Sequence, residues 1–96
     1  MITILAWLKA KPGKESLLYE ECRKVAKLVR ENEPGCKMYI PHVSKNDLAE
    51  IVFIEKYADK AALKHHLETP YYKALVAKYG DLIEGEPDFK MLKELI

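Results

Sequence analysis

The stretch 36-CKMYIPHVSKNDLAEIVFIEKY-57 decides the fold of this chain. Residues 36–43 and 48–57 are rich in β-branched and aromatic side chains, and their apolar residues alternate with the period of two that is typical of a strand. The polar residues between them, Ser-Lys-Asn-Asp, are suited to a turn. We therefore predict an antiparallel hairpin in which residues 48–57 form the strongest strand of the chain.

A helix is predicted before this hairpin, over residues 15–33. Apolar side chains recur there at steps of four and three, which is the stripe of an amphipathic helix. The pair Pro34-Gly35 ends the helix. The stripe consists of Leu18, Cys22, Val25 and Val29.

A second helix is predicted after the hairpin, over residues 60–68. Asp59 stands at its start, where an acidic side chain can accept a hydrogen bond from the first backbone N–H groups. Leu63 and Leu67 mark the stripe that we expect this helix to bury.

A proline separates this helix from a third one. Thr69 precedes Pro70, and a residue before proline avoids α geometry, so the chain should break there. Thr69 can then cap a helix over residues 71–83, with Pro70 at its favoured first position. Residues 89–95 are predicted to form the last strand. The buried side of the third helix is predicted to carry Leu75, Val76, Tyr79 and Leu82.

The first strand is predicted over residues 2–10, which gives the element order βαββαβ. This order is typical of an α+β, ferredoxin-like sandwich. We expect one domain over residues 1–96, with a four-stranded antiparallel sheet of strand order 4-1-3-2 and the helices on one face.

The other face of such a sheet has no cover, yet Leu5 and Trp7 should project there from the first strand. A chain of 96 residues has a thin core, so additional burial between subunits is favourable. We therefore predict a homodimer through the open sheet face that includes Trp7.

Composition excludes several classes of partner. Sixteen basic and fifteen acidic residues give a net charge of +1 without a long basic block, so nucleic acid is not an expected partner. No apolar run approaches the roughly 18 residues of a membrane span, and the first residues lack the features of a signal peptide. We expect a cytoplasmic protein. Cys22 and Cys36 are too few for a disulfide framework and are predicted to be free thiols.

The candidate site lies in 62-ALKHHLETPYYKALVAKYG-80, where two histidines precede a Thr-Pro break and a tyrosine pair. His65 and His66 lie about 100° apart on a helix, so they cannot both face the sheet or form a helical metal pair. No acidic or cysteine partner stands at ligand spacing, so we predict no metal. His66 should border the interior, where an imidazole can accept a proton near neutral pH.

Four segments resemble the family of antibiotic biosynthesis monooxygenases and cofactor-free quinol monooxygenases. They are 9-KAKPGKE-15, 34-PGCKMY-39, 55-EKYADKAALKHHLETPYY-72 and 85-GEPDFKML-92. The resemblance covers nearly the whole chain. It implies a dimeric α+β barrel that oxidises a small aromatic or quinol-type substrate with O2, without flavin, haem or metal.

The resemblance also implies roles for individual residues. His66 matches the family histidine and would be the base that forms the substrate anion, whereas the position of His65 is variable. Tyr72 matches a family aromatic whose hydroxyl would fix a substrate oxygen. Glu55 would orient His66 or a substrate hydroxyl, or it forms a structural ion pair. The predicted pocket wall consists of Tyr71, Tyr39, Phe53 and Tyr57.

Other interpretations of the same residues stay open. His66 could bond a core carbonyl while the tyrosines only pack, and Tyr39 could serve the core or the dimer. If His66 is the base, its partly apolar surroundings should lower its pKa, and we favour an arrangement in which Glu55 does not contact it.

The family contains further chemistries. A haem-degrading branch uses Asn, Trp and His at positions that match Ala6, His66 and Val76, and none is retained. A second branch isomerises a small phosphorylated hydroxyketone, and 66-HLETPYYK-73 is also similar to its His-x-x-Thr-Pro-x-Tyr run. An isomerase and a non-catalytic dimeric ligand-binding module therefore remain as alternatives to the monooxygenase.

Overall fold

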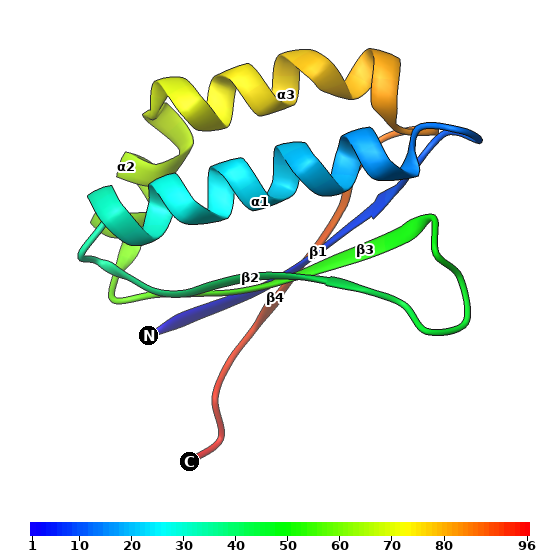
Figure 1. The fold of residues 1–96 in the computed structure, drawn as a ribbon. Helices are drawn as coiled ribbons and strands as arrows, with labels where there is room; N and C mark the ends of the chain where they lie inside the picture. The colour runs from blue at the N-terminus through cyan, green and yellow to red at the C-terminus, as the bar shows by residue number, and fades with distance from the viewer.

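The computed structural model describes residues 1–96 as a four-stranded antiparallel sheet with three helices on one face (Figure 1). The strands are β1 (Ile2–Lys9), β2 (Cys36–Val43), β3 (Glu50–Tyr57) and β4 (Asp88–Leu92). The helices are α1 (Glu15–Asn32), α2 (Lys60–Glu68) and α3 (Pro70–Leu82). The sheet order is β2-β3-β1-β4, which confirms the predicted ferredoxin-like topology and strand order.

Three strands are shorter than the sequence predicted, and β1 ends at Lys9, one residue before the predicted end. β3 begins at Glu50 rather than at residue 48, because the side chain of Asp47 accepts a hydrogen bond from the backbone N–H of Ala49 at 3.0 Å and extends the turn. β4 ends at Leu92 rather than at residue 95. Leu92 pairs with Thr3 near the start of β1, so the neighbouring strand offers almost no further partner.

The core lies between α1, α3 and the sheet. The predicted stripe of α1 is buried, and it packs on inward-facing residues of β1 and β3 such as Leu8, Ile51 and Phe53. These contacts confirm the helix face that the sequence predicted for α1.

The predicted stripes of the two other helices are partly wrong. Leu67 is 45% exposed, because α2 turns His66 toward the sheet instead. Val76 is 43% exposed, because it lies beside Leu75 on the flank of α3 that faces the uncovered region near β4. The stripe of α2 is therefore rotated by about one residue, whereas in α3 Leu75, Tyr79 and Leu82 keep the predicted side and only Val76 departs from it.

Thr69 forms the break between α2 and α3 that the sequence predicted. Its backbone is extended, with φ −67° and ψ 145°, as expected before Pro70. Its hydroxyl donates to the carbonyl of His66 at 2.8 Å and accepts from the backbone N–H of Tyr72 at 3.3 Å. The break therefore joins the backbones of two residues that belong to different helices.

Gly35 lies where the chain entering β2 passes against α2. A Cβ added there would stand 2.8 Å from the Cβ of Ala62, closer than carbon atoms normally approach. We expect Gly35→Ala to displace α2 and to lower the free energy of unfolding by about 1–3 kcal/mol, measured by urea denaturation. Gly80→Ala is the matched control, because an added Cβ meets no atom within 4 Å at that helical position. Equal stability of the two variants would contradict the close approach.

Apolar side chains occupy the sheet face that the helices leave open. Leu5 and Trp7 of β1 lie beside Ile54 and Val52 of β3 in the strand register, and all four are half-buried. This placement confirms the predicted orientation of Leu5 and Trp7. None of the helices combines the length and apolar character needed to cross a membrane.

Candidate active site

His66 is enclosed by aromatic rings from three other elements. Its imidazole is 1% exposed and lies 4.9 Å from the ring of Tyr39, 5.4 Å from that of Tyr57 and 4.8 Å from that of Tyr72, measured between centroids. His65 is exposed, as the helical angle between the two histidines predicted. The structure therefore places one histidine of the pair in the interior.

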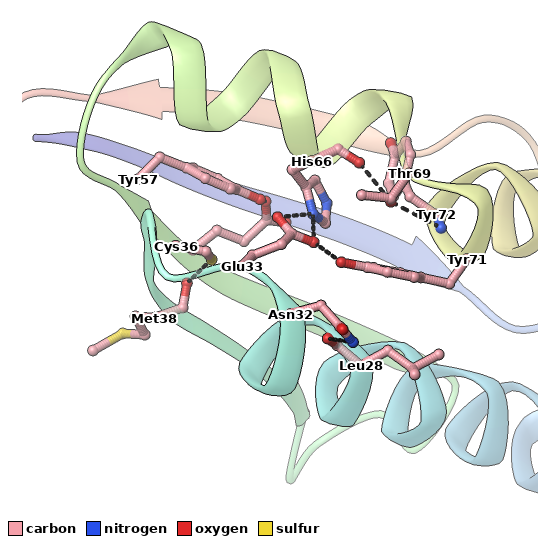
Figure 2. A network of polar contacts seen from close by, with 11 residues as sticks. Leu28, Asn32, Glu33, Cys36, Met38, Tyr57, His66, Thr69, Tyr71 and Tyr72 are labelled. Carbon is pink, nitrogen blue, oxygen red and sulfur yellow. Dashed lines mark hydrogen bonds and ion pairs between the residues drawn. The ribbon is translucent and has the colours of Figure 1, made fainter.

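Glu33 contacts the buried imidazole (Figure 2). Both of its carboxylate oxygens lie 3.1 Å from Nδ1 of His66, and the glutamate is only 3% exposed. The hydroxyl of Tyr71 donates to Oε2 of the same carboxylate. Glu33 is the residue that follows the last turn of α1, so the end of this helix delivers the carboxylate to the site.

The second nitrogen of His66 has no partner. Nε2 is buried and bonds no protein atom. Burial lowers the pKa of His66, and the hydrogen bond that the imidazole makes to Glu33 offsets this effect only in part. The lowered pKa favours the neutral imidazole at neutral pH, and one nitrogen of a neutral imidazole can accept a proton.

Glu55 forms a separate buried pair with Tyr57. The hydroxyl of Tyr57 donates to Oε1 of Glu55 at 2.7 Å, and the carboxyl is 6% exposed. Burial raises the pKa of Glu55 to about 7, and the charge of Glu33 adds to this effect. Glu55 bonds Tyr57 and not His66, in agreement with the arrangement that the sequence analysis favoured.

This raised pKa has a consequence for stability. The folded state favours the protonated carboxyl of Glu55, so its stabilising contribution is complete below about pH 4.5 and is lost as the pH rises to about 7. Glu55→Gln cannot ionise and can still accept from Tyr57. We expect its unfolding free energy, relative to the unaltered protein, to rise by up to about 3 kcal/mol between pH 4.5 and pH 8. Urea denaturation at both pH values measures this; a pH-independent difference would contradict the buried carboxyl.

A hollow of about 420 Å³ opens between α3 and β4, on the helix side of the sheet. Tyr72 belongs both to this hollow and to the rings around His66. Glu86 is its one charged lining residue. A larger hollow, of about 470 Å³, lies between α1 and α3, but it is lined mostly by charged residues and shares none with the His66 cluster. The smaller hollow is therefore the better candidate for a substrate.

The structure brings the predicted site residues into one cluster. Phe53 joins it through Tyr39, whose ring centroid lies 5.0 Å away, and Tyr71 joins it through Glu33. Tyr39 and Phe53 are also core residues, and the hydroxyl of Tyr71 is engaged by Glu33. Their contact with a substrate stays a prediction, as do the catalytic roles of His66, Tyr72 and Glu55.

Sequence reasoning missed Glu33, which it treated only as the end of a helix. One signal was available. A carboxylate at the C-terminal end of a helix opposes the helix dipole, and a buried position there requires a compensating donor. The position of Glu33, directly before Pro34-Gly35, therefore indicated a carboxylate that needs a buried donor, and the imidazole of His66 is such a donor.

Metal and thiol chemistry find little support in this arrangement. No group of three or more His, Cys, Asp or Glu side chains is placed to hold a metal ion. Cys22 and Cys36 are free thiols, as predicted. Burial raises the pKa of Cys22 to about 12 and that of Cys36 to about 11, so neither is a ready nucleophile at neutral pH.

Known proteins resemble the chain over most of its length. Residues 1–78 match the family described as antibiotic biosynthesis monooxygenase. YcnE of Bacillus subtilis (strain 168), provisionally named a monooxygenase, is 31% identical over 88 residues, with 92% of each chain covered. YgiN of Escherichia coli (strain K12), provisionally named a quinol monooxygenase, is 30% identical, with 90% of this chain and 88% of YgiN covered.

Solved structures agree with this likeness. A Caulobacter crescentus CB15 protein, provisionally named an antibiotic biosynthesis monooxygenase, superposes with a TM-score of 0.92 at 35% identity, covering 99% of this chain and 90% of that one. The chain spans 62% of the length of another curated relative, sll1783 of Synechocystis, to which it is 28% identical.

Proposed function

Since the chain belongs to the antibiotic biosynthesis monooxygenase family, we propose that it oxidises a small aromatic or quinol-type substrate with O2, without an organic or metal cofactor. The observation that carries this proposal is the buried imidazole of His66, whose Nδ1 is bonded to Glu33 and whose Nε2 has no protein partner. Such a nitrogen can take a proton from a phenolic hydroxyl.

After deprotonation, the substrate anion itself reacts with O2. Loss of the hydroxyl proton to Nε2 of His66 leaves an electron-rich phenolate, which transfers electrons to O2 and forms a carbon–oxygen bond. Cleavage of the O–O bond and loss of the ring hydrogen then release water. For a hydroquinone the products are a hydroxyquinone and one water, and the substrate supplies all four electrons that reduce O2.

The surroundings of His66 suit an aromatic guest. The hollow that shares Tyr72 with the rings around His66 has about 420 Å³, within the roughly 300–1,000 Å³ of small-molecule pockets. Burial raises the pKa of Tyr72, so its hydroxyl stays protonated and can donate to a substrate oxygen. Glu55 would act through its bond to Tyr57, whose ring contacts the imidazole.

The two alternatives are less well supported. An isomerase of a phosphorylated substrate needs cations near the pocket, but Lys64 and Lys73 are exposed and do not line the hollow. A non-catalytic binding module would have a sealed apolar cavity without a polar group near His66. Glu33 occupies that place instead.

We further propose that two copies associate through the open sheet face. The contiguous apolar surface on this face consists of Leu5, Trp7, Val52 and Ile54. Burial of these side chains against a second copy is worth several kcal/mol before the cost of association, at about 25 cal/mol per Å².

Oxygen consumption tests the proposed function. Metal-stripped protein is mixed with a panel of hydroquinones and anthrone-like phenols in an oxygen electrode, and products are analysed after reaction under 18O2. We expect substrate-dependent uptake, with one 18O atom in the product. Absence of uptake across the panel, or a requirement for added metal or flavin, would contradict the proposal.

A further inference from the structure

The contact between Glu33 and His66 fixes which imidazole nitrogen carries the proton. We propose that Glu33 is a positioning residue that holds neutral His66 as the Nδ1–H tautomer and thereby reserves Nε2 for the reaction. The catalytic part of this inference rests on the proposed function, whereas the tautomer itself does not.

The geometry of the carboxylate supports this assignment. Both oxygens of Glu33 lie 3.1 Å from Nδ1, and the side chains of His66 and Glu33 are 1% and 2% exposed. An ionised carboxylate can only accept hydrogen bonds. Nδ1 must therefore be the donor in this pair, and the proton of the neutral ring stays on that nitrogen.

Tyr71 is a second donor that holds the carboxylate of Glu33 in place. Its hydroxyl donates to Oε2, so donors from α2 and α3 meet on a carboxylate that follows α1. Two donors compensate the burial of the charge, which a single donor would leave incompletely satisfied. Glu33 is thus oriented before any substrate arrives.

The Nε2–H tautomer would be less stable for two reasons. Its Nε2–H would be buried without an acceptor, and the electron pair of Nδ1 would face a carboxylate. In the Nδ1–H tautomer, Nε2 can accept a hydrogen bond, but no protein group donates one. A substrate hydroxyl could be that donor. The titratable groups around the imidazole are Glu33, Tyr39, Glu55, Tyr57, His65 and Tyr72.

The tautomer can be read directly from two-bond 1H–15N correlation spectra of 15N-labelled protein near pH 8. We expect protonated Nδ1 and unprotonated Nε2 for His66 in the unaltered protein. Glu33→Gln presents an amide that can donate to Nδ1, so a large share of the Nε2–H form should appear. The matched control Glu31→Gln changes an exposed carboxylate in the same helix and should leave the spectrum unchanged.

Kinetics then test the catalytic part. Glu33→Gln should lower kcat by about 10- to 1,000-fold with little change in KM, since a wrongly protonated imidazole cannot act as the base. The rising limb of its pH profile should also move to lower pH, because Glu33 raises the pKa of His66 against the effect of burial. Tyr71→Phe keeps the carboxylate and should lose less activity.

The outcomes separate this inference from the proposed function. The Nδ1–H tautomer in the unaltered protein, lost in Glu33→Gln, supports the inference even if no substrate of the panel is oxidised. The Nε2–H tautomer in the unaltered protein overturns it even if the enzyme is active. This spectrum decides the matter by itself if Glu33→Gln fails to fold.

Discussion

Replacing His66 by alanine is expected to slow substrate-dependent O2 consumption by about 10²–10⁴-fold, the range that general-base catalysis contributes. The buried Nε2 of His66 is the candidate atom for taking the substrate proton, and it has no hydrogen-bond partner in the protein. His65→Ala is the matched control, because the adjacent imidazole is exposed and should not contribute.

A loss of activity must be separated from a loss of structure. His66→Ala removes a donor from the buried carboxylate of Glu33 and leaves a cavity, so unfolding free energy should fall as well. His66→Gln retains an amide that can donate to Glu33 but is not a base. We expect it to be as inactive as the alanine variant and considerably more stable. Near-normal activity in His66→Gln would remove the imidazole from the base role.

The pH dependence gives an independent check on His66. Because burial lowers its pKa, activity should already exceed half of its plateau at about pH 6.5, the unperturbed value for histidine. The same shift makes the neutral imidazole part of folded-state stability, present above pH 6.5 and lost as the pH falls through that value toward the folded pKa. A pH profile whose shape survives in His66→Ala, at reduced height, would contradict the assignment.

Local signals in the sequence were sufficient for the topology. The hairpin followed from alternation around a polar turn, the end of α1 from Pro34-Gly35, and the break between α2 and α3 from Thr69-Pro70. Each of these signals acts through backbone geometry within a few residues, so no knowledge of distant contacts was needed. The resemblance to a known family was needed to predict a dimeric barrel and the role of His66 as the base.

The interior of the site depended on contacts that local patterns do not encode. Glu33 and His66 are 33 positions apart, and their pairing follows from how the end of α1 meets α2. Leu67 illustrates the same limit: periodicity gave an apolar stripe, but the rotation of α2 was decided by burial of His66 with its carboxylate partner. The polar pair, more than the leucines, sets the orientation of that short helix.

Replacing Trp7 by aspartate is expected to weaken the proposed dimer by about 10³-fold in Kd. A central tryptophan typically contributes 2 kcal/mol or more to an interface, and a symmetric dimer loses it twice, or roughly 4 kcal/mol. The new carboxylate would lie beside Val52 and near Asp88 of the neighbouring strands, so apolar burial would be replaced by an unpaired charge next to another acid.

Sedimentation velocity at micromolar concentration measures this effect, with Leu17→Asp as the control. That change introduces the same charge at an exposed apolar position of α1, on the helix side of the sheet, and should leave the dimer intact. A monomeric unaltered protein, or a stable dimer of Trp7→Asp, would contradict the proposed interface. Because Trp7 and the His66 cluster lie on opposite faces of the sheet, the dissociated variant should remain folded and keep its turnover. Loss of turnover at full helical content would mean instead that the second copy completes the site.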